Sequence, residues 1–421
     1  MNDATMNDAT MHDAAPPPLS PTLHWTGDDG QSHEVAWRSL AGVPAPKRVR
    51  LADDTLSADA AYRLVCEGTA LLWQGDFQQA RQMLQALGRR MDHSAQRRGQ
   101  RKPAAPPVAP PEGMAPITQA FHLHRKAQAE RARILGLLLI PFEAGHRIPL
   151  RRAPDVQAAC LEAHGPADAP YAASLRELQG LIGAHEWRKK GVPVPALGAS
   201  IHPHHGVFSP VRGEYLDLLR DAPLPAALQA QGAQGEAWDI GTGTGVIAAV
   251  LARRGVPHVL ATELAPRALA CAQDNLQRLG LGQRVSVLQT DLFPLPGASP
   301  RRAALIVCNP PWLPGHPSSA VEQAIYDPDS RMLKGFLNGL AAHLLPGGEG
   351  WLILSDFAER LGLRSREQLL GWIAQAGLTV AGRLDIRPRH GKAQDRGDPL
   401  HAARSGEVTS LWRLQGASQP A

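Results

Sequence analysis

The stretch Trp238-Asp239-Ile240-Gly241-Thr242-Gly243-Thr244-Gly245-Val246 decides the fold of the second half of the chain. Its pattern is that of a buried strand, a turn with three glycines, and the start of a helix. Gly241 permits the tight turn, Gly243 lets the backbone approach a ligand, and Gly245 lets the helix pack closely on the strand. The Gly-x-Gly-x-Gly spacing differs from the Gly-x-Gly-x-x-Gly of pyrophosphate-binding turns. The stretch therefore predicts a ligand site that does not have to hold a pyrophosphate.

Short β-type runs alternate with helical stretches on both sides of this turn, which is typical of a doubly wound parallel sheet. The expected strands span 236–240, 258–262, 284–288, 303–308, 350–355, 379–384 and 408–414. The expected helices between them span 246–254, 265–279, 331–344 and 365–376. We therefore predict an α/β domain over residues 200–421, with a seven-stranded sheet that closes with a hairpin.

Three acidic residues lie at or just beyond the ends of successive predicted strands. Asp239 lies in the first strand of the sheet, Glu263 follows the second, and Asp291 follows the third. Ligands of such sheets bind at the carboxyl ends of the strands. Each acid alone could be a helix cap or a solvated loop charge. Three of them at neighbouring strand ends, after a glycine-rich turn, favour one shared ligand site.

The fourth predicted strand runs directly into Asn309-Pro310-Pro311-Trp312. The two prolines fix their own φ and push the preceding residues toward extended conformations, so the loop is stiff. It can present the Asn309 side-chain oxygen and the Pro310 carbonyl as two convergent acceptors, and Trp312 adds a flat face for a planar group. A purely structural Pro-Pro turn is the alternative, but the position at the end of a central strand argues against it.

Together these residues resemble the class I methyltransferases that use S-adenosylmethionine (SAM), and within that class the branch that methylates amino nitrogens. That branch includes release-factor glutamine methyltransferases, which carry Asn-Pro-Pro-Tyr. It also includes adenine- and guanine-N-methylating enzymes with Asn/Asp-Pro-Pro-Tyr/Phe/Trp, so that Trp is a permitted but less common fourth residue. The resemblance covers about residues 200–421 and implies a Rossmann-like seven-stranded sheet.

The resemblance also implies roles in cofactor binding. Asp239 would orient the SAM ammonium group, Glu263 would accept hydrogen bonds from the ribose hydroxyls, and Asp291 would bond the adenine amino group. The complete expected set of cofactor-binding residues is Asp239, Gly241, Thr242, Gly243, Gly245, Glu263, Asp291 and Asn309.

The catalytic residues implied are Asn309, Pro310 and Trp312. An amide or arylamine nitrogen is a poor nucleophile because its lone pair is delocalised. Two acceptors that each take one hydrogen of the NH₂ group would orient it and stabilise the positive charge that grows on nitrogen, while Trp312 would stack on the planar group.

Two flanking segments are candidates for contact with the methyl acceptor. Residues 206–215 resemble the Pro-containing segment that folds over cofactor and acceptor in the glutamine methyltransferases, although the acidic-Thr pair usual there is absent. A basic stretch from residue 387 to 396 lies between the last two strands, where it is either a phosphate-binding loop or a solvated hairpin. The expected substrate-binding residues are Phe208, Pro210, Arg212, Pro311, Trp312, Arg387 and Arg389.

The first half of the chain carries no comparable chemistry. We expect a polar lead-in over 1–19, a small helical domain over 20–93, a basic and Pro-rich linker over 94–116, and a further helical region over 117–199. The helical domain could be a recognition module or a packing domain with a solvated basic face. His202, His204 and His205 could suggest a metal, but nothing completes a site, so we expect unpaired histidines and no metal.

Composition narrows the class of protein. The chain has 421 residues, 43% hydrophobic and 20% charged, which suits two or three globular domains. Four scattered cysteines indicate thiols rather than a disulfide frame or a zinc site. A net charge of +5 is compatible with an RNA or ribosomal partner. Neither a membrane-spanning run nor a signal pattern is present, so the sequence predicts a cytoplasmic protein.

The sequence thus predicts a SAM-dependent N-methyltransferase that acts on a planar amide or exocyclic amino nitrogen. The acceptor would be a macromolecule, either a protein glutamine or an RNA or DNA base, with a ribosome-associated target as one option. The alternative is a SAM-binding or RNA-binding adaptor that has lost catalysis. The intact Asn309, Pro310, Asp239 and Glu263 argue against that alternative, because an inactive relative has no chemical need for them.

Overall fold

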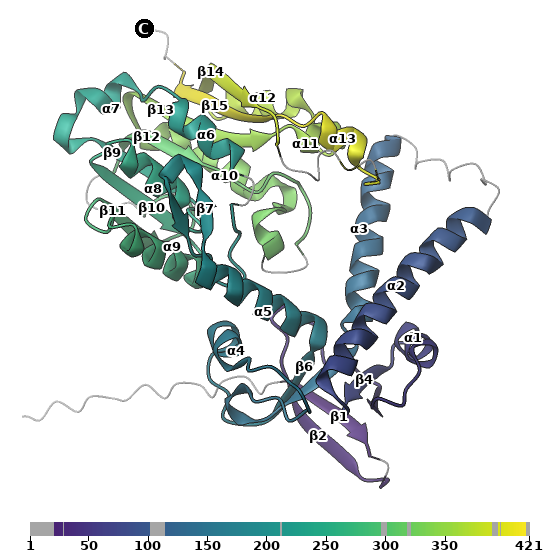
Figure 1. Ribbon diagram of the computed structural model, residues 1–421. Coiled ribbons are helices and arrows are strands. Elements are labelled where there is room, and N and C mark those ends of the chain that lie inside the picture. The colour runs from purple at the N-terminus through teal and green to yellow at the C-terminus, as the bar shows by residue number, and fades with distance from the viewer. Residues whose placement is uncertain are drawn as a thin grey trace, which may run out of the picture.

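The structure is a computed structural model that describes residues 21–27, 29–101, 114–210, 213–295, 301–317, 321–389, 395 and 397–417, with the side chains of 94–101 excepted. The described chain forms two domains, each built around one large sheet (Figure 1). Nowhere in these ranges is there a helix with the length and apolar character needed to span a bilayer.

Seven strands form the C-terminal sheet in the order β11-β10-β9-β12-β13-β15-β14. Strands β11 to β13 pair in parallel, and β15 runs antiparallel to both of its neighbours. The strands are β9 (Glu236–Ile240), β10 (His258–Glu263), β11 (Val285–Gln289), β12 (Ala303–Cys308), β13 (Leu344–Ser355), β14 (Leu378–Ile386) and β15 (Thr409–Gly416). This confirms the α/β class and the seven-stranded, mostly parallel sheet expected from the sequence.

Helices cover both faces of this sheet. Alternate residues of the central strands enter two different core clusters, so Ala237 and Val307 face one side while Trp238 and Ile306 face the other. The first cluster includes α6 (Glu214–Asp221) and α8 (Val246–Arg253), and the second includes α10 (Arg331–His343) and α12 (Arg366–Gln375). The remaining elements are the hairpin β7 (Val192–Val194) and β8 (Ala199–Ile201), with α7 (Ala226–Ala230), α9 (Pro266–Arg278), α11 (Phe357–Arg360) and α13 (His401–Ser405).

The N-terminal domain contains a six-stranded mixed sheet in the order β1-β2-β6-β5-β4-β3. Its strands are β1 (Thr22–Thr26), β2 (Ser32–Trp37), β3 (Val49–Ala52), β4 (Ala70–Trp73), β5 (Leu138–Phe142) and β6 (Tyr171–Ser174). Its helices are α1 (Ala58–Cys66), α2 (Phe77–Arg101), α4 (Gln157–His164) and α5 (Leu175–Lys190). Residues on both sides of the expected linker therefore belong to one sheet.

This domain differs from the mainly helical region that the sequence predicts. Strands β4 and β6 are buried at every residue, and β5 at all but Pro141, so they show no alternation of apolar and polar side chains. A short, wholly apolar run cannot be told from part of a buried helix by its periodicity. The sequence predicts a helical region over 117–199, and both β5 and β6 lie within that range. The expected linker also begins too early, because α2 continues to Arg101.

One helix, α3 (Pro116–Leu135), ties the two domains together (Figure 1). Near its start, Thr118 donates a hydrogen bond to the Leu361 carbonyl of the C-terminal domain at 2.7 Å. Phe121 is buried in a cluster with Leu313 and Phe357 of that domain. Its last turn, in contrast, belongs to the core of the N-terminal domain. Helix α3 thus packs into the cores of both domains and helps to set the angle between them.

We expect Phe121→Ala to lower the free energy of unfolding by about 3–5 kcal/mol, because the substitution leaves a cavity at this seam. The matched control is Leu123→Ala on the same helix, whose side chain is 59% exposed and should cost less than about 0.5 kcal/mol. Urea unfolding of both variants and the wild-type protein measures the difference. Equal stability of the two variants would contradict the role given to α3.

Candidate active site

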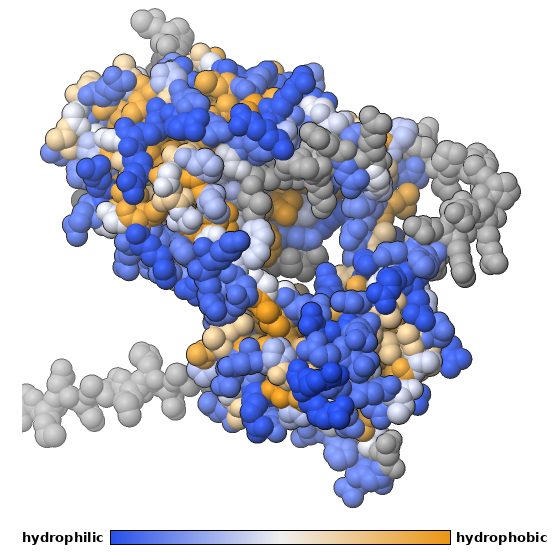
Figure 2. Space-filling model, in the orientation of Figure 1, coloured by the Kyte–Doolittle hydropathy of each residue, from blue (hydrophilic) through white to orange (hydrophobic). Residues whose placement is uncertain are grey.

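A cavity of about 1540 Å³ lies between the two domains, at the carboxyl ends of β9, β10 and β12. The C-terminal domain lines it with the glycine-rich turn, the Asn309–Leu313 loop and residues 322–328. The N-terminal domain lines it with residues 39–46 and one face of α3. Figure 2 shows the hollow between the domains, with hydrophobic residues along its walls.

The three glycines of the turn after β9 all have positive φ, as the sequence predicts for a tight turn. A Cβ on Gly241 would meet the Met332 methyl group at 2.4 Å, and one on Gly245 would meet Ala272 at 3.3 Å. A Cβ on Gly243 would meet nothing within 4 Å, and this residue lines the cavity. Gly241 and Gly245 thus have close neighbours, whereas Gly243 leaves open space where a ligand can approach the backbone.

Asp239 supports the glycine-rich turn through hydrogen bonds. It is fully buried and lies outside the cavity lining. Its Oδ2 accepts hydrogen bonds from the Thr242 hydroxyl at 2.5 Å and the Ala248 amide at 3.0 Å. Its Oδ1 has no hydrogen-bond partner among the described residues. Desolvation raises the pKa of this carboxyl group to about 7. A contact with a ligand ammonium group stays a prediction.

Glu263 connects the end of β10 to the same turn and lines the cavity. Its Oε2 accepts from the Gly243 amide at 3.0 Å, and its Oε1 accepts from the amides of Leu264 and Ala265, both at 2.9 Å. These three bonds fix the carboxylate at the cavity wall. Since each carboxylate oxygen has more than one acceptor site, the group keeps capacity for ligand hydroxyls.

Asp291 lies in the loop after β11 and also lines the cavity. It forms an ion pair with Arg331, the first residue of α10, which lines the cavity as well. The sequence did not single out Arg331. The only signal was its place at the start of the helix that the sequence predicts over 331–344.

The loop after β12 carries the four residues that the sequence singled out, and all four line the cavity. The Trp312 indole Nε1 donates a hydrogen bond to the Asn309 Oδ1 at 2.9 Å. Trp312 is half-buried and packs against both core clusters of the sheet. A carboxamide oxygen has a second lone pair, so Asn309 can accept one further hydrogen bond. Trp312 therefore holds the Asn309 amide in place, a contact that the motif alone does not predict.

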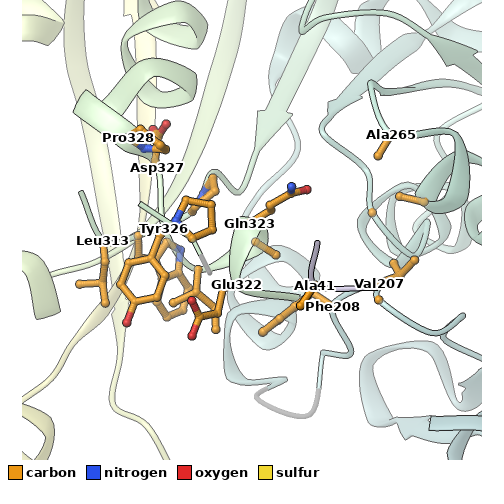
Figure 3. A pocket seen from close by; sticks show the side chains of 18 of the residues that line it. Ala41, Val207, Phe208, Ala265, Leu313, Glu322, Gln323, Tyr326, Asp327 and Pro328 are labelled. Carbon is orange, nitrogen blue, oxygen red and sulfur yellow. The ribbon is translucent and has the colours of Figure 1, made fainter. Parts of the chain in front are cut away.

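The segment that follows this loop is held against α10 by hydrogen bonds of Asp327. The Asp327 amide donates to the Leu313 carbonyl at 2.8 Å, and its buried carboxylate accepts from the amides of Met332 and Leu333 at 2.9 and 3.1 Å. Desolvation raises the pKa of this carboxyl group. Figure 3 shows Leu313, Tyr326 and Asp327 beside one another at the cavity. The loop after β12 is thus fixed at both ends.

The two flanking segments, residues 206–215 and 387–396, differ in their position relative to the cavity. Phe208 and Pro210 line the cavity, as expected, while Arg212 lies outside the described residues. Arg387 and Arg389 are exposed and do not line the cavity. The Arg389 amide donates to Glu214 at 2.7 Å and its guanidinium lies 3.6 Å from Asp217, so it is tied to α6 instead.

The three histidines before this domain are not unpaired, contrary to the expectation. The His202 Nδ1 lies 2.6 Å from the Arg188 carbonyl, and the His204 Nε2 lies 3.3 Å from Asp274. The Arg267 guanidinium lies 3.3 Å from the His205 Nδ1 and donates to the His205 carbonyl at the same distance. The His202 contact joins α5 to the C-terminal domain. Across the described ranges, no group of three or more His, Cys, Asp or Glu side chains could hold a metal ion.

Residues 198–362 match the family model described as "Methyltransferase small domain". The match confirms the resemblance that the sequence carries to methyltransferases. A release factor glutamine methyltransferase from Cereibacter sphaeroides is 34% identical over 166 residues, which cover 36% of this chain and 56% of that protein. The tRNA1(Val) (adenine(37)-N6)-methyltransferase from Shewanella loihica is 27% identical over 164 residues, which cover 38% and 65%.

The chain spans little more than half the length of the first of these relatives. Among solved structures, the ribosomal protein L11 methylase from Lactobacillus delbrueckii subsp. bulgaricus has a TM-score of 0.30 and 15% identity, covering 45% of this chain and 75% of that one.

The raised pKa of Asp239 makes stability depend on pH. The folded protein keeps a proton that the unfolded chain releases above about pH 4, so this group destabilises the fold increasingly as the pH rises toward about 7. Asp239→Asn keeps an acceptor for the Ala248 amide but does not titrate. We expect the stability of this variant, relative to wild type, to rise by up to about 1.4 kcal/mol per pH unit between about pH 5 and 7. Urea unfolding at several pH values measures it, and a constant difference would contradict it.

Proposed function

We propose, from the methyltransferase domain over residues 198–362, that this protein transfers a methyl group from SAM to a planar amide or exocyclic amino nitrogen. One observation carries the proposal: Asn309-Pro310-Pro311-Trp312 lines the same cavity as the glycine-rich turn. The two relatives described above are named for glutamine and for adenine N6, which are both planar nitrogens. Since both are named as methyltransferases, they give no support to an inactive adaptor.

The residues present at the cavity fit SAM. Gly243 leaves open space for a ligand next to the backbone, and the cavity has acidic groups at the ends of two neighbouring strands. Glu263 would accept the ribose hydroxyls, and Asp291 with Arg331 would bind the adenine. When bound, SAM supplies an electrophilic methyl group: the N–C bond forms as the C–S bond breaks, the sulfur keeps the electron pair, and the nitrogen releases a proton to water.

The chain itself would supply orientation and charge stabilisation. The Asn309 Oδ1 and the Pro310 carbonyl would each accept one hydrogen of the acceptor NH₂ group. They would then face the positive charge that develops on nitrogen in a partly desolvated site, where such interactions are strong. The Trp312 hydrogen bond restrains the Asn309 amide, so less freedom is lost when the acceptor binds.

We expect Asn309→Ala to lower kcat by about a hundredfold or more, because loss of one such group costs about 2.7–4 kcal/mol in a comparable case. Binding of S-adenosylhomocysteine, measured by calorimetry, should change little. Transfer from tritiated SAM into a cell extract gives the rate. The control is Asn338→Ala, the same change at an exposed position of α10 outside the cavity. Near-wild-type turnover of Asn309→Ala would remove Asn309 from the mechanism.

A double-mutant cycle separates the two roles available to Trp312. Trp312→Phe keeps a flat ring but removes the N–H donor. If Trp312 acts through Asn309, this change should lower kcat about two- to tenfold in the wild-type background and have no further effect on Asn309→Ala. Additive losses in the double variant would show that the ring acts on the acceptor independently of Asn309.

A further inference from the structure

We propose that Arg125, on helix α3 of the N-terminal domain, is a positioning residue for methyl transfer. Its guanidinium holds the segment that follows the Asn309-Pro310-Pro311-Trp312 loop, here called the post-loop segment and described at residues 313–317 and 321–326. Through this segment Arg125 orients the Asn309 carboxamide. The inference rests on the proposed function and extends it, because it gives the N-terminal domain a part in the reaction that does not depend on which molecule accepts the methyl group.

Arg125 contacts the post-loop segment at three points. Its Nη2 donates a hydrogen bond to the His316 carbonyl at 2.9 Å and lies 3.5 Å from the Glu322 carboxylate. Its Cζ lies 3.9 Å from the centre of the Tyr326 ring, which is a cation–π contact. The guanidinium is planar and rigid, so the three contacts together fix the position of the segment relative to α3.

The contact between Arg125 and the Tyr326 ring is close and partly shielded from water. The Arg125 side chain is 26% exposed and that of Glu322 is 32% exposed. A Cβ on Gly315 would meet the Tyr326 ring at 3.2 Å and the Arg125 Nη1 at 3.3 Å, so a larger residue would crowd the pair. Figure 3 shows Tyr326 and Glu322 beside one another at the cavity. Because salt and solvent screen partly buried charges less than exposed ones, these contacts can restrain the segment.

Helix α3 gives Arg125 a fixed base. Phe121, one turn earlier on the same face of the helix, is buried in a cluster with Leu313 of the post-loop segment. The last turn of α3 belongs to the core of the N-terminal domain. Both ends of the helix are therefore packed, and the distance from the Arg125 backbone to the post-loop segment is set by that packing.

The post-loop segment folds back on its own first residue, Leu313. The Leu313 amide donates to the Ile325 carbonyl at 3.1 Å, and the Leu313 carbonyl accepts from the Asp327 amide at 2.8 Å. Leu313 also forms a parallel bridge with Tyr326. A shift of Tyr326 is therefore passed directly to Leu313.

The chain from Leu313 back to Asn309 is short and stiff. Pro310 and Pro311 fix their own φ, and the Trp312 indole donates to the Asn309 Oδ1 at 2.9 Å. The loop therefore transmits a shift of Leu313 to the Asn309 carboxamide instead of absorbing it. Methyl transfer needs exact alignment, and a misplacement of about 1 Å can cost about a hundredfold in rate.

An arginine in this cavity could instead bind an anionic group of the acceptor. The Arg125 guanidinium, however, lies over the Tyr326 ring and faces the Glu322 carboxylate, so its charge is already partly compensated. The two roles predict different kinetics. Loss of a group that binds the acceptor raises KM, whereas loss of a positioning group lowers kcat and leaves KM nearly unchanged.

The test uses the full-length protein, tritiated SAM and a bacterial cell extract freed of small molecules. The maximal rate at saturating extract gives kcat, and the amount of extract at half this rate gives an apparent KM. Arg125→Ala should lower kcat about tenfold, with the apparent KM and S-adenosylhomocysteine binding within about twofold of wild type. Arg125→Lys should recover little of this loss, because an ammonium group cannot reproduce the contacts of a planar guanidinium.

Arg131→Ala is the matched control. Arg131 lies on the same helix, pairs with Asp92 of the N-terminal domain, has a side chain that is 34% exposed, and does not line the cavity. Urea unfolding should show similar small losses of stability for Arg125→Ala and Arg131→Ala, since each substitution removes one partly exposed ion pair. Only Arg125→Ala should lose rate.

A double variant tests whether Arg125 acts through Asn309. In the Asn309→Ala background, Arg125→Ala should lower kcat by no more than about twofold, because the group that it positions is already gone. An equal loss of about tenfold in both backgrounds would overturn the positioning role.

The other outcomes are equally distinct. An unchanged kcat in Arg125→Ala, or a loss that Arg131→Ala matches, would overturn the inference and leave the methyltransferase proposal standing. A rise in the apparent KM at constant kcat would also overturn it, because that result marks a residue that binds the acceptor. An absence of label in every fraction with the wild-type protein would overturn the proposed function, and the inference with it.

Discussion

The register of β9 between β10 and β12 is the constraint on which the site depends. Ile240 pairs with Thr262 on one side and with Cys308 on the other, all in parallel. The residues that follow Ile240, Thr262 and Cys308 in the sequence are Gly241, Glu263 and Asn309. Because the three strands end level, residues separated by as many as 68 positions in sequence meet at one edge of the sheet. A shift of one residue in the β9–β12 pairing would displace the glycine-rich turn from the Asn309 loop by about 3.3 Å, and the same shift in the β9–β10 pairing would displace the turn from Glu263.

This arrangement explains why much of the catalytic half could be predicted from sequence. Strand ends, glycines with positive φ and a Pro-Pro loop are local features, and the rule that ligands bind at the carboxyl ends of parallel strands places them together. The contacts that refine the site are not local features. The Arg331 pair with Asp291 and the bracing role of Asp239 depend on packing, and the Trp312 bond to Asn309 depends on the rotamers of both side chains.

The sheet of the N-terminal domain, in contrast, could not be predicted from the sequence. Strand β5 pairs with β4 although the whole α2–α3 segment lies between them in the sequence, and β2 pairs with β6 over a still longer separation. Pairings of this kind leave no local signal, and strands buried along their whole length lack the alternation that identifies a strand. The expectation of a helical region followed from the helices alone. The sheet nevertheless fixes the start of α5, and with it the Glu177 carboxylate that accepts from the Leu40 amide.

The two domains therefore contribute different parts of one cavity. The C-terminal domain supplies the glycine-rich turn and the Asn309 loop, while α3 and residues of the 39–46 loop of the N-terminal domain form the opposite wall. Helix α3 belongs to both cores, so the spacing of the walls is set by packing rather than by a flexible linker. A cavity whose walls come from two domains can bind a cofactor in one part and select an acceptor in the other.

The most direct measurement is the affinity for S-adenosylhomocysteine, determined by calorimetry for wild type, Gly243→Val and Gly280→Val. Both glycines have positive φ and neither has an atom within 4 Å of a Cβ, but only Gly243 lines the cavity. If the turn after β9 holds the cofactor, wild type and Gly280→Val bind with similar affinity and Gly243→Val binds at least about tenfold more weakly. Equal affinity for all three proteins, or no binding by wild type, would contradict the account.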